Sequence, residues 1–270
     1  MLRILTAAVL APLLWVVLKV APPWLFVAVF SVGIAAATLE AYRLLQRAGR
    51  TPHVAAGVLA AFLLAWSFGD IAPRIPPLAV LAAAAAVAML AALTTRLEPA
   101  AMLDAWTSTL FPVFAIAFPL SHTIAIRGFP GDDGADLLLL LFVCVIFGDT
   151  GALYLGSACG RRRLAPSVSP NKSWEGALGG VVASLLGALL AVAWFYRRLG
   201  VGHAVALGIG LGILGILGDL GESALKRAVG AKDSSTLLPG HGGLLDRVDS
   251  LLLSAPMLYY YYRLCMSDGL

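Results

Sequence analysis

Charged side chains are scarce in this sequence. Asp, Glu, Lys and Arg make up 13% of its 270 residues and hydrophobic side chains make up 60%, whereas a soluble domain is usually about a quarter charged. A chain of this length could bury a soluble core, but its apolar residues form long uninterrupted runs instead. The shortage of charge therefore excludes an ordinary soluble domain.

Cysteine is scarce as well. Cys144, Cys159 and Cys265 are scattered, and their spacing fits neither a disulfide framework nor a metal site. The net charge of +4 is modest. In a chain this apolar, basic residues are expected to mark cytoplasmic loops and to meet anionic lipid or nucleotide. We therefore expect no nucleic-acid partner.

Apolar runs long enough to cross a bilayer are abundant. In lipid, the backbone must satisfy its own hydrogen bonds, so such runs form helices. The sequence predicts an all-α fold, a polytopic integral membrane helical bundle of about nine transmembrane helices. The predicted spans are Ile4–Val20, Trp24–Leu39, Val54–Phe68, Leu78–Leu93, Leu110–Ile126, Leu137–Leu155, Trp174–Phe195, Ala204–Leu220 and Leu245–Tyr262.

We expect one membrane domain over residues 1–270. Its N-terminal spans, within residues 1–135, have no assigned role, and residues 136–270 form a catalytic half with polar loops at 156–173 and 221–244. Most of the 19 basic residues fall on the side of the membrane that holds the N-terminus, if the predicted spans are correct. The positive-inside rule then places the N-terminus and both loops in the cytosol and the C-terminus outside. We expect a bacterial inner-membrane protein.

Four aspartates lie at the cytosolic ends of the predicted spans, and charge at such positions is costly and usually functional. Asp246 and Asp249 are three residues apart, so a continuous helix would present both on one face. Asp219 shares a predicted face with Ser223 and Lys226, and Asp149 lies near the end of the sixth span. Clustered oxygen ligands favour Mg²⁺ over zinc. The alternative is that each aspartate pairs with a nearby base, such as Lys226 or Arg247.

The loop before the ninth predicted span is rich in residue types that handle phosphate. It contains Lys226, Arg227, Lys232 and His241, with glycines at 240, 242 and 243. Lysine and arginine neutralise phosphate, and glycine lets backbone N–H groups approach it closely. The loop therefore predicts a phosphate-binding turn beside the aspartates.

These segments resemble the signature of phosphatidate cytidylyltransferases, also called CDP-diacylglycerol synthases. The likeness covers roughly residues 147 to 250 and rests on Gly148-Asp149-Thr150-Gly151-Ala152, Ser169-Pro170-Asn171-Lys172-Ser173-Trp174-Glu175-Gly176, Ser223-Ala224-Leu225-Lys226-Arg227, Lys232-Asp233, Pro239-Gly240-His241-Gly242-Gly243 and Asp246-Arg247-Val248-Asp249. Ser235 departs from the family pattern, in which many members have glycine. The resemblance implies condensation of CTP with phosphatidate, giving CDP-diacylglycerol and pyrophosphate, with Mg²⁺ and room for a second cation.

The resemblance also suggests a role for each matching residue. Asp219, Asp246 and Asp249 would be catalytic metal ligands, with Asp149 a further ligand or nucleotide contact, and Lys226 would be catalytic. The substrate-binding set would comprise Ser223, Arg227, Lys232, Asp233, His241, Gly242, Gly243, Arg247, Lys172 and Asp149. A homodimer is left open. Outside the resemblance, Glu40 and Arg43 have the spacing of an ion pair at a helix end.

Two other functions fit parts of the pattern. A CTP-dependent lipid-alcohol kinase would release CDP instead of pyrophosphate and would gain from a general base. An ion-coupled transporter would also carry intramembrane carboxylates, but near the midplane. The fuller match of the last loop disfavours the kinase. The gathering of acidic residues at one end of the C-terminal half disfavours the transporter.

Overall fold

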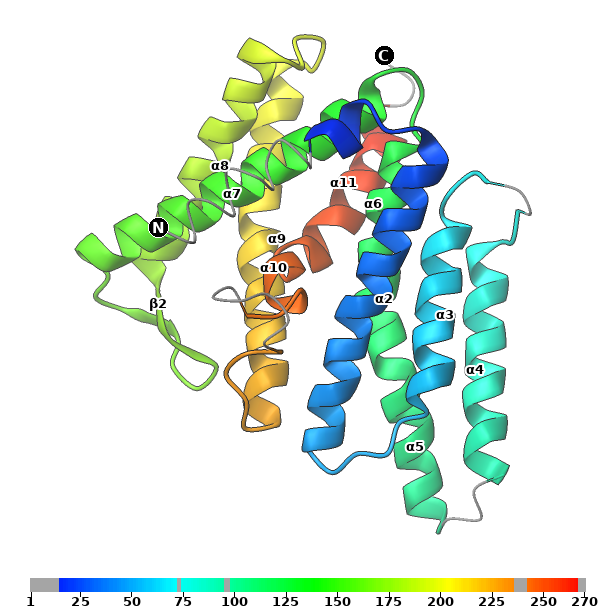
Figure 1. Ribbon diagram of the computed structural model, residues 1–270. Coiled ribbons are helices and arrows are strands. Elements are labelled where there is room, and N and C mark those ends of the chain that lie inside the picture. The colour runs from blue at the N-terminus through cyan, green and yellow to red at the C-terminus, as the bar shows by residue number, and fades with distance from the viewer. Residues whose placement is uncertain (1–14, 72–73, 95–97, 236–241, 267–270) are drawn as a thin grey trace. The chain divides into compact units, whose positions relative to one another are not determined.

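The computed structural model describes residues 15–71, 74–94, 98–235 and 242–266. It is almost entirely helical, which confirms the predicted all-α class, with one short antiparallel hairpin (Figure 1). The elements are α2 (Pro23–Arg47), α3 (Val54–Ser67), α4 (Pro77–Thr94), α5 (Pro99–Pro112), η1 (Val113–Ala117), α6 (Phe118–Arg127), α7 (Asp133–Cys159), β1 (Arg163–Ala165), β2 (Ser169–Ser173), α8 (Trp174–Trp194), α9 (Val201–Ala228), α10 (Leu245–Val248) and α11 (Leu251–Cys265).

Six helical segments in the described part of the chain are long and apolar enough to cross a membrane. They are α2, α4, the continuous stretch Pro99–Arg127, α7, α8 and α9, while α3 is apolar but shorter, with 14 residues. The first predicted span lies mostly outside the described residues, so the total of nine stays a prediction. The chain is an integral membrane protein with several spans.

Three predicted boundaries were wrong. The span predicted to begin at Leu110 begins at Pro99, because the π-helical turn η1 lets the helix continue past Pro112. The polar stretch 156–173 is only partly a loop, since α7 runs to Cys159 and the rest forms the hairpin. The stretch 221–244 begins as helix, because α9 continues to Ala228.

The ninth predicted span is also interrupted. It consists of α10 and α11, and a turn at Asp249 and Ser250 separates them. Asp246 and Asp249 therefore do not share one helix face, and that prediction was wrong. The single turn of α10 ends before Asp249 is reached.

The chain forms two compact units. Unit 1 contains residues 1–128 and 226–248, and unit 2 contains residues 129–225 and 249–270. In unit 1, α2 to α6 pack together and α10 packs on α2. The buried hydroxyl of Tyr42 donates to the carbonyl of Thr109 at 2.5 Å, which joins α2 to α5 through the space left by Gly57.

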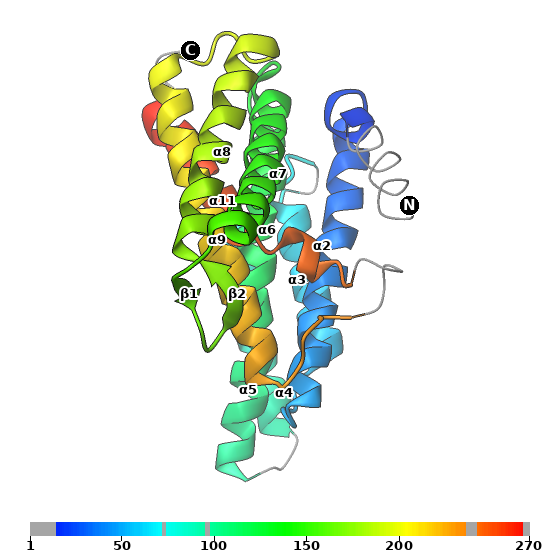
Figure 2. The same cartoon turned by 90° about the vertical axis from the view of Figure 1, so that its left-hand side faces the viewer.

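Unit 2 is built on the pair α7 and α8, which lie side by side with the hairpin at one end (Figure 2). Their backbones touch through glycine. A Cβ on Gly151 would lie 2.8 Å from the carbonyl of Gly179, and a Cβ on Gly176 would lie 2.9 Å from the carbonyl of Ala152. Small residues at such contacts are how membrane helices gain packing energy without a hydrophobic driving force.

A buried polar cluster joins three parts of unit 2 near the start of α7. The carboxylate of Asp133 accepts hydrogen bonds from the hydroxyls of Tyr196, at 3.2 Å, and Tyr262, at 3.1 Å. Arg198 adds an ion pair, with its Nε 2.9 Å from Asp133. The cluster links α7, the segment that follows α8, and α11.

Candidate active site

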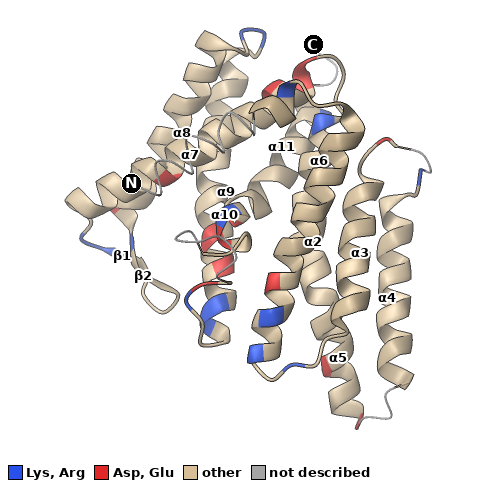
Figure 3. Ribbon diagram, in the orientation of Figure 1, with Lys and Arg blue, Asp and Glu red and all other residues tan. Residues whose placement is uncertain are grey.

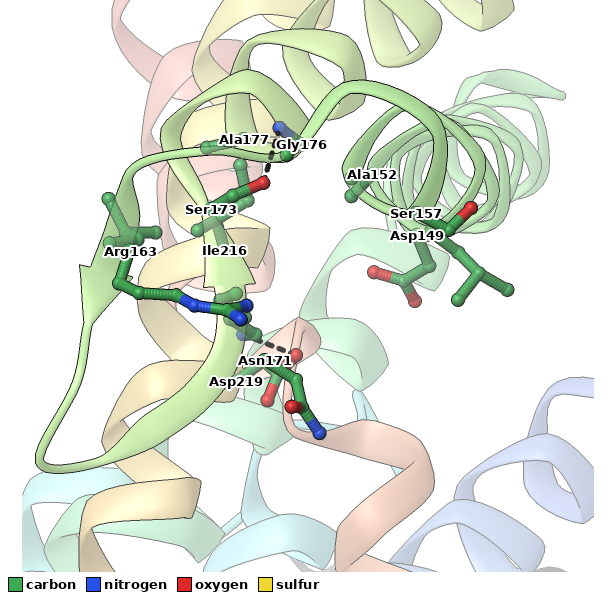
Figure 4. Close-up of a pocket in the computed structure, with 15 residues that line it drawn as sticks. Asp149, Ala152, Ser157, Arg163, Asn171, Ser173, Gly176, Ala177, Ile216 and Asp219 are labelled. Carbon is green, nitrogen blue, oxygen red and sulfur yellow. Dashed lines mark hydrogen bonds and ion pairs between the residues drawn. The ribbon is translucent and has the colours of Figure 1, made fainter.

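Unit 2 contains a pocket of about 590 Å³ at the hairpin end of α7. This volume is within the range of pockets that hold small ligands, about 300–1,000 Å³. The lining residues come from α7, the hairpin, the start of α8 and α9. Figure 4 shows Asp149 on α7 across the pocket from Arg163 and Asn171 on the hairpin, with Asp219 of α9 also facing it.

Local hydrogen bonds fix the hairpin to the start of α8. Ser173 is the N-cap of α8, and its hydroxyl accepts the backbone N–H of Gly176 at 3.1 Å. The carboxylate of Glu175 accepts the backbone N–H groups of Arg161, at 3.0 Å, and Arg162, at 3.3 Å. These contacts hold β2, and with it Lys172, at the edge of the pocket.

Lys172 and Asp219 form an ion pair, with 2.5 Å between Nζ and a carboxylate oxygen. The other oxygen of Asp219 accepts a hydrogen bond from Ser223, one turn later on α9, at 3.3 Å. Both members of the ion pair are partly exposed, 24% for the Lys172 side chain and 31% for Asp219. The Nζ atom of Lys172 is itself buried, so the exposed part of that side chain is its aliphatic stem.

Three carboxylates of unit 2 lie close together. Ligand atoms of Asp219, Glu222 and Asp249 all fall within 4.8 Å of one another. Glu222 is 2% exposed, so its charge is costly unless neighbouring groups or a cation offset it. A set of oxygen donors from three carboxylates fits a hard divalent cation such as Mg²⁺.

The turn after α10 explains how Asp249 joins this cluster. The backbone of α9 at Gly218 approaches the turn so closely that any Cβ there would overlap the carbonyl of Asp249. The charged residues of α9 lie only in its C-terminal part, after Gly218 (Figure 3), which is the part that this turn approaches. Asp149 lines the pocket but is not a member of this carboxylate cluster among the described residues.

Asp246 has different surroundings, in unit 1. Its carboxylate accepts hydrogen bonds from the Lys226 ammonium at 2.7 Å and from the backbone N–H groups of Gly243, at 2.8 Å, and Ser234, at 3.1 Å. The Lys226 and Asp246 side chains are only 12% and 9% exposed. Asp246 thus links the end of α9 to Ser234 and Gly243 in the segment that precedes α10.

Glu40 lies on α2 in the same unit and contacts the same segment. Its carboxylate accepts hydrogen bonds from the hydroxyls of Ser234 and Ser235 and from the backbone N–H groups of Leu244 and Leu245. The predicted ion pair with Arg43 is not found among the described residues, because the carboxylate turns to these donors instead.

Most of the remaining predicted site residues that the structure describes lie at or near the surface. Arg227 donates to the carbonyl of Ala231 at 2.9 Å, closing the end of α9. Lys232, Asp233 and Arg247 are exposed, Gly242 is half-buried, and Gly243 is buried. His241 lies outside the described residues. The roles predicted for these residues stay predictions.

Nearly the whole chain matches a known protein family. The model of the cytidylyltransferase family matches residues 1–265. This chain belongs to that family. The resemblance seen in the sequence motifs is thereby confirmed, and it extends over the N-terminal helices, where the motifs gave no sign of it.

Two of the curated relatives of this chain carry names that match the family. Phosphatidate cytidylyltransferase of Haemophilus influenzae is 44% identical over 48% of this chain and 46% of its own length. Phosphatidate cytidylyltransferase of Brucella suis is 46% identical over 48% of this chain and 49% of its own. The uncharacterised protein YnbB of Escherichia coli is 38% identical over 62% of this chain and 57% of its own. The chain therefore spans about half the length of these relatives.

Sequence reasoning missed two acidic residues of this chain. Glu222 had a usable signal, because it follows Asp219 by three residues on one helix and so shares its face. For Glu40 the only signal in the sequence was its position within an apolar run, where a carboxylate is costly. That signal marks a residue as important without naming its partners, which lie near the other end of the chain.

Proposed function

We propose that this chain is a phosphatidate cytidylyltransferase, condensing CTP with phosphatidate to give CDP-diacylglycerol and pyrophosphate. The observation that carries the proposal is the cluster of Asp219, Glu222 and Asp249, whose first member lines the pocket beside Lys172. Family membership and the names of the relatives support the same reaction.

The proposed chemistry needs little from a general base. An oxygen of the phosphatidate phosphate attacks the α-phosphorus of CTP. A new phosphorus–oxygen bond forms, and the bond from the α-phosphorus to the bridging oxygen breaks. The electron pair leaves with pyrophosphate. The nucleophile is already ionised near neutral pH, so the main obstacle is repulsion between two anions.

The residues of the pocket and of the carboxylate cluster suit that task. Asp219, Glu222 and Asp249 would hold Mg²⁺, which when bound neutralises phosphate charge and orients phosphate oxygens. Lys172 and Arg163 offer cationic groups at the pocket. Asp149 and Asp246 remain proposed as further ligands, and a second cation remains a proposal with them.

The segment around α10 would hold the triphosphate. We propose that Lys226, Arg227 and Lys232 neutralise it, and that His241 with Gly242 and Gly243 shapes the turn that meets it. Arg247, Asp233 and Ser223 belong to the same proposed set.

We also propose an orientation in a bacterial inner membrane, with the N-terminus and the active site in the cytosol and the C-terminus outside. The distribution of basic residues supports it, and CTP is a cytosolic nucleotide. Single cysteines introduced near Arg163 should react with an impermeant reagent only from the cytosolic side. Labelling there from outside intact cells would reverse the orientation.

The reaction is tested by product analysis. Purified protein is incubated with phosphatidate, Mg²⁺ and CTP labelled on the α-phosphorus, and lipid and aqueous products are separated. We expect label in the lipid and an equal amount of free pyrophosphate. Labelled CDP in the aqueous phase would indicate a lipid-alcohol kinase, and no CTP consumption would exclude both. The family match does not favour the kinase or a transporter.

A further inference from the structure

Glu40 has the most extensive set of hydrogen bonds described for any side chain of α2. One carboxylate oxygen lies 2.9 Å from the Ser234 hydroxyl and 2.9 Å from the Leu245 amide nitrogen. The other lies 2.6 Å from the Ser235 hydroxyl and 3.0 Å from the Leu244 amide nitrogen. Each oxygen therefore faces one hydroxyl and one backbone N–H.

The energetics of this contact point to a specific role. Glu40 is 2% exposed, and a buried carboxylate is costly unless hydrogen bonds compensate for lost hydration. Hydrogen bonds to a charged acceptor are about twice as strong as neutral ones. An apolar side chain would offer no acceptor to the four donors that face Glu40, so simple packing does not account for a carboxylate here.

The contacts also explain two residues of the predicted signature. A Cβ on Gly243 would lie 2.9 Å from the carboxyl carbon of Glu40, so the position admits only glycine while Glu40 occupies that space. Ser235, where many family members have glycine, donates one of the four hydrogen bonds. The departure from the family pattern thus adds a contact to Glu40.

Glu40 and Asp246 meet at Ser234. The Ser234 hydroxyl is 2.9 Å from an oxygen of each carboxylate. A hydroxyl has one proton, so it can donate to only one of them at a time. The Ser234 backbone N–H remains directed to Asp246 at 3.1 Å. The position of Asp246 therefore depends on the same short segment that Glu40 holds.

We propose that Glu40 is a positioning residue for nucleotide binding. It holds residues 234–235 and 244–245 in place on α2, so that the segment carrying Gly243 and Asp246 has its phosphate-binding shape before CTP arrives. This role rests on the proposed function. It gives the N-terminal half, whose role the sequence left unassigned, a part in shaping the nucleotide site.

The test compares Glu40→Gln with Asp104→Asn, a matched acid-to-amide change at a carboxylate of unit 1 that pairs with Arg50. Gln keeps the size of Glu40 but presents an NH₂ group to two of the four donors. We expect Glu40→Gln to lower kcat/KM for CTP by on the order of tenfold to a hundredfold, since small misplacements cost that much. KM for phosphatidate should change less than twofold, and Asp104→Asn should match the wild type.

A second variant covers the case in which Glu40→Gln does not fold. Ser235→Ala keeps the buried charge and three of the four donors. It should also lower kcat/KM for CTP, but by less than Glu40→Gln does. The proposal is overturned if folded Glu40→Gln has a lower melting temperature but unchanged kinetics for CTP. If Glu40→Gln cannot be purified, unchanged kinetics for Ser235→Ala overturn it. A wild type that does not convert CTP would overturn the proposed function and this inference with it.

Discussion

At the scale of single residues, similar carboxylates in this chain have very different surroundings. Asp246 accepts two backbone N–H groups besides its lysine partner. Asp219 also pairs with a lysine, but it lies close enough to Glu222 and Asp249 to share a cation with them. Sequence spacing could not distinguish these surroundings, because a separation of three residues predicted that Asp246 and Asp249 share one helix face. The structural surroundings make the cluster in unit 2 the stronger candidate for the metal site.

Glu222→Gln tests that cluster. It removes one charge and keeps the size of a buried side chain. We expect the turnover rate to fall by on the order of a hundredfold, as for loss of a major electrostatic stabiliser, and the Mg²⁺ concentration for half-maximal rate to rise. The melting temperature should not fall, because a buried amide is less costly than a buried carboxylate.

The control for Glu222→Gln is Asp70→Asn, at an exposed carboxylate that pairs with Arg74. This variant should keep the wild-type rate and Mg²⁺ requirement. Wild-type turnover of Glu222→Gln at limiting Mg²⁺ would remove Glu222 from the metal site.

The candidate site was predictable only in part. Asp249 and Lys172 could be named because each stands in a local motif, and Asp219 because it is a charge at the end of a predicted span. The structure brings Lys172 to Asp219. The partners of Glu40 are 194 to 205 residues away in sequence, and no local pattern records a contact of that range. His241 was named from its motif, and its role stays a prediction.

At the scale of elements, the sequence predicted helices well and their ends poorly. Apolar runs located α2, α4, α7, α8 and α9, because lipid leaves helix as the main choice. The π-helical turn before α6 and the break between α10 and α11 have no signal in the hydropathy pattern, which predicts one uninterrupted span across each. The hairpin was missed because its strands are short and polar, without the alternation that marks a half-buried strand.

The contact between α7 and α8 gives a prediction at this scale. Gly151→Ala would place a methyl group 2.8 Å from the carbonyl of Gly179, so the helices must move apart. We expect a loss of roughly 1–3 kcal/mol of stability, as for overpacking in a dense core, seen as a lower melting temperature in detergent. Activity should fall as well, because Asp149 and the hairpin depend on this contact.

Gly202→Ala on α9 is the matched control, since a Cβ there would meet nothing within 4 Å. It should leave melting temperature and activity unchanged. Equal effects of the two substitutions would show that helix propensity, and not the contact between α7 and α8, governs the result.

At the scale of the whole molecule, the polar cluster around Asp133 sets a pH limit on unit 2. Burial raises the pKa of Tyr196 above its ordinary value of 10.0, and the charge of Asp133 and its hydrogen bond raise it further. The folded state therefore keeps the proton on Tyr196 when the unfolded chain has lost it. The contribution of Tyr196 to the free energy of unfolding is fully present below about pH 10 and declines as the pH rises further.

Tyr196→Phe tests this limit. The variant loses the hydrogen bond to Asp133, which costs about 1–3 kcal/mol at neutral pH, but it has no phenol to ionise. Its melting temperature should be lower than that of the wild type at pH 8 and should fall less steeply between pH 10 and pH 11. Tyr154→Phe, at an exposed position, serves as the control. Parallel curves for Tyr196→Phe and the wild type would contradict the prediction.

The contacts of Glu40 have a consequence for how the chain is made. The ribosome completes α2 long before it reaches Ser234, and about 200 residues separate Glu40 from its hydrogen-bond donors. At about 5–20 residues per second, that interval lasts roughly 10–40 seconds. Until then the carboxylate must take its hydrogen bonds from other groups, because these donors have not yet been made. The N-terminal helices can therefore insert early, but they cannot reach their final packing until the last quarter of the chain has been synthesised.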